Sequence, residues 1–319
     1  MTKPPYEITP SLLTLYGRIH ERLGQCTGLM LTRPEARLRR ENRIRTIQSS
    51  LAIEGNTLGL EQVTAILDNK RVIAPEKEIL EVQNAIEAYK LLGSVDPTSP
   101  DDFLRIHGIL LRGLVEDAGS FRSGAVGIVK AGEVRHIAPG SHMVPGLMAN
   151  LFEYLRTDDD PIVIKSSVFH YEMEFIHPFQ DGNGRMGRFW QTRVLMDENP
   201  IFEYLPVEAA IKRNQSGYYR ALADSDSQGR STLFLEFALE RILESLDEVL
   251  LESGNRVIEY RERVEFALSQ LEGWFDRKTY LELCKNISTA TASRDLKRMV
   301  EQKVVEVSGS GRMTRYRKT

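Results

Sequence analysis

The spacing of hydrophobic residues along most of the chain is that of amphipathic helices. Ile44, Ile47 and Leu51 recur at intervals of three and four residues, which predicts a helix over residues 35–53. Ser99 and Pro100 have the residue types of an N-cap and a first helical position. By the same reasoning we expect helices at residues 75–89, 99–110, 143–156 and 161–175, from about 185, and at 233–251. The pattern predicts a mainly α protein.

Two segments depart from this spacing. Residues 124–138 place short apolar stretches on either side of a turn at Lys130–Glu133, which predicts a β-hairpin. Near the C-terminus, the pattern predicts two helices and then two strands around a Gly-Ser-Gly turn, at residues 278–285, 289–302, 304–307 and 314–317. This order predicts a winged helix-turn-helix at the C-terminal end.

Composition excludes several classes of protein. Of the 319 residues, 41% are hydrophobic and 27% are charged, which excludes a disordered or collagen-like chain. Two cysteines, Cys26 and Cys284, cannot form a disulfide framework and indicate a reducing compartment. The first residues lack the pattern of a signal peptide, and no apolar run has the length of a membrane span. We expect a soluble, cytoplasmic protein that does not enter a membrane.

The small net charge of −3 conceals an uneven distribution. Residues 278–319 carry ten Lys and Arg against four Asp and Glu, so this segment has a charge of +6 and the rest −9. The basic residues of 289–318 predict contact with DNA phosphates. The side chains concerned are Ser293, Arg294, Lys297 and Arg298 on the second helix, and Arg312, Arg315, Arg317 and Lys318 in the wing. Protein docking, dimerisation and a merely solvated charged face stay open as alternatives.

Residues 177–188, with the sequence HPFQDGNGRMGR, combine residue types that suit phosphate chemistry. His177 can act as a general base near neutral pH, and Asp181 offers a carboxylate to Mg²⁺. The glycines at 182 and 184 allow a tight turn that leads into a helix N-terminus, where backbone N–H groups attract anions. Arg185 and Arg188 lie one turn apart and can bind further phosphate oxygens. The combination indicates phosphoryl or nucleotidyl transfer.

These twelve residues resemble the full signature of the Fic family, HxFx(D/E)GNGRxxR, at every fixed position. The resemblance implies a helical core over residues 98–235 and a protein adenylyltransferase, which moves AMP from ATP to a Tyr, Thr or Ser hydroxyl of a target protein or of itself. His177 would deprotonate that hydroxyl, and Phe179 would anchor the loop. Asp181 would hold Mg²⁺ on the α- and β-phosphates. Glycine at 184 favours AMP transfer, because the Doc-like relatives that phosphorylate carry lysine there.

The resemblance also implies the residues that bind ATP. The backbone of Gly182, Asn183 and Gly184 would bind the phosphates, and the Asn183 side chain would contact the α-phosphate. Arg185 would bind the β-phosphate and Arg188 the γ-phosphate, with Gly187 in the same helix. The adenine pocket would contain Asn214, Tyr218 and Tyr219. Core packing of one of the two tyrosines remains an alternative. The hairpin at 124–138 stands where the family has its flap, whose exposed strand edge can pair with a target segment. A merely structural hairpin is the alternative.

A second segment, from Ser50 to Gly55, resembles the family's inhibitory motif (S/T)xxxE(G/N). A bidentate pair between Glu54 and Arg188 would occupy the partner of the γ-phosphate, and Ser50 would tether Glu54 to the site. An ordinary helix end capped by Gly55 is the plain alternative. Glu54 could instead orient a water that removes AMP, which would make the enzyme bifunctional or mainly de-AMPylating.

The expected organisation has four regions. They are an N-terminal region with the inhibitory motif at 1–97, a Fic catalytic domain at 98–235, a helical connector at 236–262 and a winged-helix domain at 263–319. The layout also implies a homodimer. The target protein stays unknown.

Overall fold

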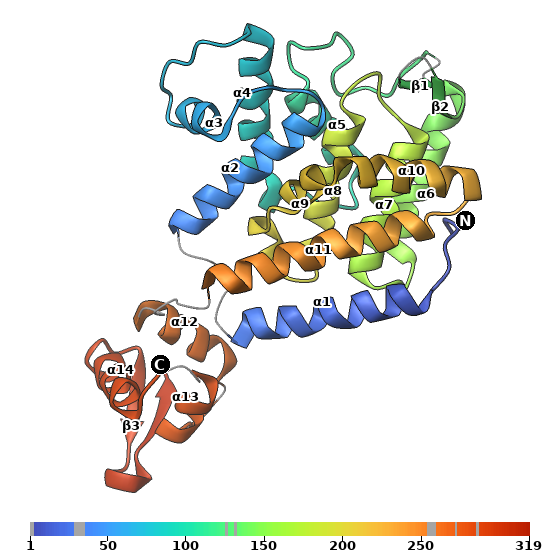
Figure 1. Ribbon diagram of the computed structural model, residues 1–319. Coiled ribbons are helices and arrows are strands. Elements are labelled where there is room, and N and C mark those ends of the chain that lie inside the picture. Colours follow the sequence, from blue (N-terminus) through green and yellow to red (C-terminus); the bar gives the residue numbers. More distant parts are fainter. Residues whose placement is uncertain are drawn as a thin grey trace. The chain divides into compact units, whose positions relative to one another are not determined.

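The computed structural model describes residues 3–28, 36–124, 127–130, 133–253, 260–271, 273–284 and 287–319. These residues are mainly helical, with two small antiparallel sheets of two strands each (Figure 1). The elements in chain order are α1 (Pro10–Gly28), α2 (Ala36–Ile53), α3 (Leu60–Leu67), α4 (Glu76–Lys90), η1 (Leu92–Ser94), α5 (Pro100–Leu110), β1 (Gly127–Lys130), β2 (Glu133–Ile137), η2 (Ser141–Met143), α6 (Val144–Thr157), α7 (Ile162–Ile176), α8 (Asn183–Leu195), η3 (Pro200–Tyr204), α9 (Val207–Arg213), α10 (Gln215–Gln228), α11 (Thr232–Ser253), α12 (Tyr260–Gln270), α13 (Arg277–Leu283), α14 (Thr289–Glu301), β3 (Val305–Ser308), η4 (Gly311–Met313) and β4 (Arg315–Lys318).

The predicted mainly α fold is confirmed, and each predicted helix or strand outside the hairpin lies within about two residues of its expected bounds. Ser99 caps α5 as predicted, because its Oγ accepts from the backbone N–H of Asp102 at 3.2 Å. In the hairpin, Gly127 pairs with Ile137, and the register shifts between Ile128 and Val129. The rest of the expected turn, residues 131–132, and the hairpin side chains lie outside the described residues. The pattern did not predict α1, α3, α9, α10 and α12.

The chain divides into two compact units. The first comprises Met1–His20 and Glu35–Glu248, and the second comprises Glu21–Pro34 and Val249–Thr319. Apart from residues 21–34, the expected inhibitory region therefore belongs to the same unit as the expected catalytic domain. The exact boundaries at 97, 235 and 262 stay predictions.

In the first unit, α7 and α8 pack directly against each other, and α5, α6 and α2 pack on this pair. Aromatic rings fill the space between these helices: Phe103 contacts Phe152, Phe169, Phe179 and Trp190 at centroid distances of 5.0–6.1 Å. Burial of each such ring removes a large apolar area from water. The loop between α7 and α8 is thus attached to the best-packed part of the unit.

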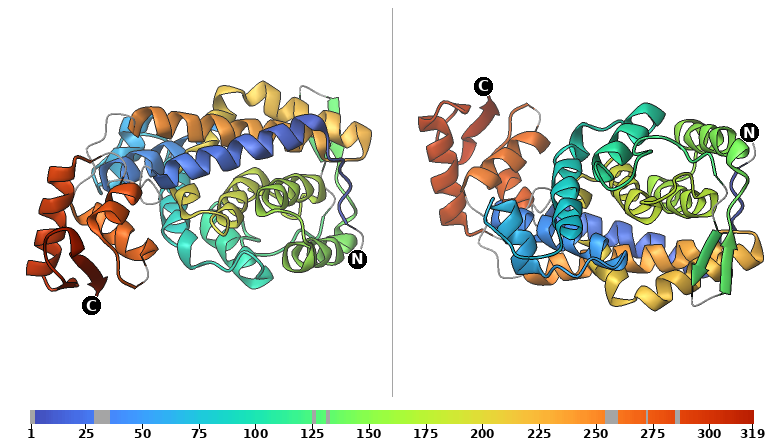
Figure 2. Two further views of the ribbon diagram at one scale, coloured as in Figure 1. Left: turned by 90° about the horizontal axis from the view of Figure 1, so that it is seen from below. Right: turned by 90° about the horizontal axis from the view of Figure 1, so that it is seen from above.

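The N-terminal segment and the first turns of α1 lie beside the start of α11, as the views in Figures 1 and 2 agree. The backbone N–H of Glu7 donates to Thr232 Oγ1 at 2.9 Å, and Thr9 Oγ1 donates to Glu236 at 2.5 Å. On another side of the unit, α2 packs against α4, α8 and α9. This packing brings the C-terminal end of α2 to α8.

The second unit has its own core, formed by α12, α13, α14 and the β3–β4 sheet. Its buried residues are Val264, Ala267, Leu268, Phe275, Tyr280, Cys284, Ala292, Leu296, Met299 and Val305. Inside this core Arg263 forms a bidentate ion pair with Asp295, at 2.7 and 3.0 Å. Tyr280 donates to the same carboxylate at 3.2 Å. The shared hydrogen bonds offset the cost of burying the charges. In the described part of the chain, no helix combines the length and apolarity that a membrane crossing requires.

Candidate active site

The loop of the signature motif begins and ends in left-handed backbone. His177 terminates α7 with φ 50° and ψ 61°, and Gly182 precedes α8 with φ 84°. Glycine adopts this region freely, whereas a histidine there costs about 1–3 kcal/mol. A Cβ at 182 would also lie 2.5 Å from Leu111 Cδ2. The turn therefore requires glycine at 182, and other contacts must hold His177 in its strained position.

Phe179 anchors the loop in the core of the unit, as predicted. Its ring is fully buried and stacks on the imidazole of His107, with centroids 3.6 Å apart and planes 4° from parallel. The Asn183 side chain closes the loop on itself. Its Nδ2 donates to the Phe179 carbonyl at 2.8 Å, and its Oδ1 accepts from the Phe179 N–H at 2.9 Å. In this arrangement the Asn183 side chain shapes the loop, and its predicted contact with the α-phosphate stays a prediction.

His107 of α5, which was not predicted as a site residue, holds the same loop. Its Nδ1 accepts from the Gly119 N–H at 2.9 Å, so its Nε2 carries the proton and donates to the Asp181 carbonyl at 3.0 Å. Burial lowers the pKa of His107 to about 4, which keeps the ring neutral at pH 7. The only sequence signal was a histidine within the apolar face of a predicted helix.

Arg188 is the most deeply buried charge of the motif, with 1% of its surface exposed. Its Nε donates to Ser50 Oγ at 3.1 Å, and its Nη2 donates both to the Ser50 carbonyl at 2.9 Å and to Glu54 Oε1 at 2.8 Å. Burial by itself lowers the pKa of this guanidinium, but the Glu54 carboxylate outweighs burial and raises it. Among the described residues, its Nη1 has no hydrogen-bond partner.

One detail of the predicted inhibitory contact was wrong. The pair between Glu54 and Arg188 is a single hydrogen bond instead of a bidentate one, since only Nη2 donates to the Glu54 carboxylate while Nε donates to Ser50. Ser50 binds Arg188 through both its hydroxyl and its carbonyl, and so links the end of α2 that carries Glu54 to the site. Gly184 explains how the carboxylate fits, since a Cβ there would collide with Glu54 and lie 3.0 Å from Arg188 Nη1. Glu54 thus lies against the first turn of α8.

Arg185 is also buried, with 5% of its surface exposed. Its Nη2 donates to Asp181 Oδ1 at 2.9 Å and its Nη1 lies 3.7 Å from Glu81 Oε1. Its Nε has no partner among the described residues. Buried guanidinium N–H groups without acceptors cost free energy, which an anion would recover. Two such groups, on Arg185 and Arg188, flank a helix N-terminus whose first N–H groups have no acceptor inside the helix.

The Asp181 side chain suits a magnesium ion that arrives with phosphates. It is 49% exposed and offers hard carboxylate oxygens. No group of three or more His, Cys, Asp or Glu side chains that could hold a metal occurs within the described ranges. Mg²⁺ commonly uses one or two carboxylates together with substrate phosphates and waters, so a single aspartate fits the predicted cofactor.

The remaining residues predicted to bind ATP lie in different surroundings, some in the core and some nearer the surface. Gly187 faces α7, where a Cβ would come within 2.7 Å of His170 Cδ2, so close helix packing accounts for this glycine better than the predicted ATP contact. Tyr218 is 1% exposed, and its hydroxyl lies 3.1 Å from His170 Nε2; it is the core tyrosine of the pair. Tyr219 is half-buried and donates to the Ile53 carbonyl at 3.3 Å. Asn214 lies between α9 and α10.

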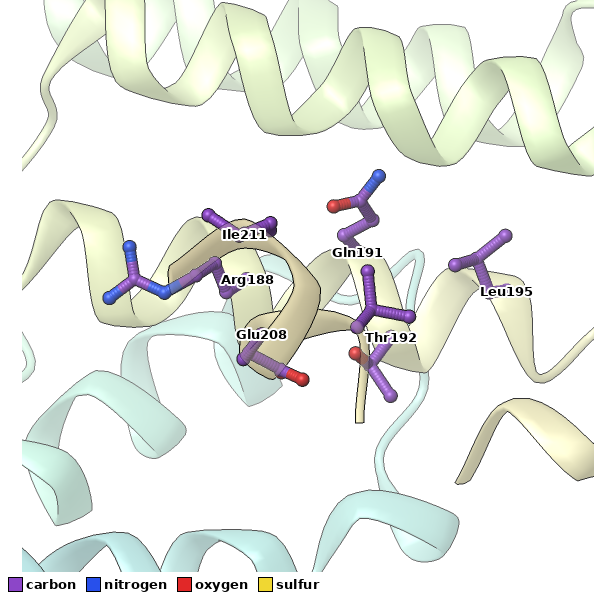
Figure 3. Close-up of a pocket in the computed structure, with 7 residues that line it drawn as sticks. Arg188, Gln191, Thr192, Leu195, Glu208 and Ile211 are labelled. Atoms are coloured by element: carbon purple, nitrogen blue, oxygen red, sulfur yellow. The ribbon is translucent and has the colours of Figure 1, made fainter. Parts of the chain in front are cut away.

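A small hollow lies beside α8. Its lining residues are Arg188, Gln191, Thr192, Leu195, Val207, Glu208 and Ile211. In Figure 3 the guanidinium of Arg188 points away from the other labelled side chains. Burial raises the pKa of Glu208 to about 7, and Tyr89 donates to its Oε1 at 3.1 Å. The hollow has no room for a water molecule and cannot hold a nucleotide.

Comparison with known proteins identifies relatives of this arrangement. The Fic/DOC family model matches residues 97–195. Among curated proteins, the chain is 30% identical over 196 residues to Protein adenylyltransferase Fic of Nematostella vectensis, which covers 54% of this chain and 44% of that protein. It is 28% identical over 219 residues to Protein adenylyltransferase fic-1 of Caenorhabditis elegans, covering 65% and 42% respectively. The chain therefore spans less than half the length of these curated relatives.

Solved structures extend the match beyond the motif. The structure of Fic-1 from Caenorhabditis elegans is 21% identical and shares the fold with a TM-score of 0.61, over 76% of this chain and 72% of that one. A Fic family protein from Desulfovibrio desulfuricans is 40% identical with a TM-score of 0.76, over 100% of this chain and 98% of that one. Because sequence and fold agree along nearly the whole of both chains, this chain belongs to the Fic family.

Proposed function

We propose that this protein is a protein adenylyltransferase that transfers AMP from ATP to a hydroxyl group of a protein. One observation carries the proposal: two buried arginines, each with an N–H group that lacks a partner among the described residues, flank the N-terminus of α8 next to His177. Such a group of donors suits a polyphosphate. The names of the curated relatives support ATP as the nucleotide.

In the proposed reaction, His177 accepts the proton of the attacking hydroxyl. A bond forms between that oxygen and the α-phosphorus, the bond to the β-phosphate bridge breaks, and diphosphate leaves. Backbone N–H groups at the start of α8 stabilise charge on the α-phosphate, and Arg185 binds the β-phosphate. Mg²⁺ held by Asp181 would neutralise part of the phosphate charge.

Glu54 is the proposed inhibitor. Its carboxylate occupies Arg188 Nη2 at 2.8 Å and contacts the first turn of α8. A γ-phosphate that bound the same guanidinium would lie close to the negatively charged Glu54 carboxylate and would be repelled by it. ATP would then bind with its α-phosphate out of line with His177.

The position of the label in ATP tests the type of transfer. With the Glu54→Gly enzyme, we expect radiolabel at the α-phosphate to appear on protein and label at the γ-phosphate to remain in solution. Transfer of the γ-label would identify phosphorylation instead. Absence of transfer from either position, by an enzyme that still binds ATP, would contradict the proposal.

A second function, binding of duplex DNA, is favoured by one face of the second unit. The side chains of Arg294 and Lys297 are exposed on α14, opposite the buried Ala292, Leu296 and Met299. An exposed basic face on the second of two packed helices suits phosphate contact in a groove. The side chain of Arg312, also predicted to contribute, lies outside the described part. A homodimer and a cytoplasmic location stay predictions.

Salt dependence of the full chain's affinity for a DNA duplex tests this second function. Each phosphate contact adds about 0.9 to the slope of log affinity against log salt. We expect the double variant Arg294→Ala, Lys297→Ala to reduce that slope by about 2. Arg261→Ala on α12, which removes an arginine with an 87% exposed side chain, serves as the control and should change the slope little. Failure of the unmodified chain to bind at low salt would leave protein docking as the better explanation.

A further inference from the structure

Arg122 is a buried arginine that the signature does not include. Only 3% of its surface is exposed, although it lies in the loop between α5 and the hairpin. Its Nε donates to the His177 carbonyl at 2.7 Å, and its Nη2 donates to the Ile176 carbonyl at 3.3 Å. A cation at the C-terminus of a helix satisfies the last carbonyls and complements the helix dipole. Arg122 therefore caps α7 at the residue proposed as the base.

The same guanidinium also binds the two ends of the hairpin segment. Nη1 donates to the Gly124 carbonyl at 2.8 Å, and Nη2 donates to the Pro139 carbonyl at 2.5 Å. Gly124 precedes β1 and Pro139 follows β2, so one side chain binds both ends of the hairpin segment. A second link between these ends runs from Ser141 Oγ to the Ser123 carbonyl at 2.7 Å.

The backbone of Arg122 joins the same arrangement, because its N–H donates to the Pro178 carbonyl at 2.9 Å. Burial lowers the pKa of the guanidinium, but an arginine stays charged in proteins. A buried charge is tolerated only with good acceptors, and here main-chain carbonyls provide them. Lysine, with one nitrogen, could not reach carbonyls on two sides in the way a planar guanidinium does.

We infer that Arg122 is a positioning residue that fixes the hairpin relative to His177. The inference rests on the proposed function, in which His177 activates the target hydroxyl, and on the predicted role of the hairpin as the flap that pairs with the target segment. Catalysis by positioning is sensitive to small displacements, since a misplacement of about 1 Å can reduce the rate about 100-fold. Arg122 also holds the αL residue His177 in place through its carbonyl, which offsets the strain of that conformation.

Two measurements on the full chain with Glu54→Gly test this inference. In the Arg122→Lys variant, we expect faster amide hydrogen exchange in both segments 124–139 and 177–182. We also expect kcat for AMP transfer onto the enzyme itself to fall at least about tenfold. The KM for ATP should stay within about twofold, because Arg185, Arg188 and α8 are unchanged. In Arg122→Ala, added guanidinium ion should restore part of the lost kcat.

The matched control is Arg105→Lys, which changes an exposed arginine of α5 that pairs with Asp102. It should alter neither exchange nor transfer. The inference is overturned if amide hydrogen exchange in the Arg122→Lys variant is as slow as in the parent in both segments. It is equally overturned if exchange rises throughout the first unit, ATP binding is lost and guanidinium restores nothing, since that pattern indicates a purely structural role. If no variant transfers AMP, the proposed function fails, while hydrogen exchange and ATP binding still decide whether Arg122 links the two segments.

Discussion

Glu54→Gly is expected to raise the rate of AMP transfer about ten- to about a hundredfold over the unmodified chain. The substitution removes the hydrogen bond of 2.8 Å between the carboxylate and Arg188 Nη2. A hydrogen bond to a charged group contributes about 1.5–3 kcal/mol, and each 1.4 kcal/mol corresponds to a factor of ten. The measurement is the initial rate of label transfer from ATP labelled at the α-phosphate.

Two further variants separate charge from backbone effects. Glu54→Gln keeps a hydrogen-bond acceptor but removes the negative charge, so its rate should lie between those of the parent and Glu54→Gly. Glu61→Gln on α3 removes an exposed glutamate elsewhere and should leave the rate unchanged. Equal rates for Glu54→Gly and the parent would contradict inhibition by this contact. Loss of AMP removal from a modified protein, without faster transfer, would instead favour the de-AMPylating role.

His177→Ala, introduced into the Glu54→Gly enzyme, is expected to lower the rate of AMP transfer by a factor of about 10² to about 10⁴. This range is the usual contribution of a positioned general base. The affinity for ATP should stay within about twofold, because the proposed phosphate ligands lie on α8. Single-turnover transfer and equilibrium binding of ATP measure the two quantities separately.

The left-handed backbone of residue 177 calls for a second substitution. Alanine is strained at φ 50°, whereas asparagine tolerates this region. His177→Asn therefore preserves the loop while removing the imidazole, and it should lose as much activity as His177→Ala. His142→Ala removes an exposed histidine and is the matched control. A rate within tenfold of the parent for both position-177 variants would contradict the role of His177 as the base.

Local pattern predicted most helices and missed others for identifiable reasons. In α1 the buried residues Leu12, Leu15 and Ile19 follow helical spacing, so the sequence does carry a signal for this helix. In α10 only Tyr218 and Ser225 are buried, which leaves little periodic signal. That helix is supported by contacts with distant segments, such as the bond from Gln215 Nε2 to the Ile53 carbonyl at 2.9 Å.

Some contacts of the candidate site were likewise predicted from the sequence, and others were not. The contact between Glu54 and Arg188 was predicted from two motifs and is present, although its geometry was predicted incorrectly. His107 and Arg122 were not predicted, because each acts on backbone carbonyls of the loop from another element. A carbonyl is the same group in every residue, so no sequence motif marks such a partner.

The sequence by itself determined the mainly α fold, the glycine turn before α8 and the residue types of the site, because helix periodicity, glycine conformation and side-chain chemistry are properties of neighbouring residues. Only the tertiary structure decided which donors of Arg188 are occupied, since Ser50 and Glu54 lie 138 and 134 residues away along the chain. It also decided that Gly187 serves helix packing and that Arg122 binds both the hairpin and His177. Such contacts depend on how separate helices pack, and packing is a property of the whole unit.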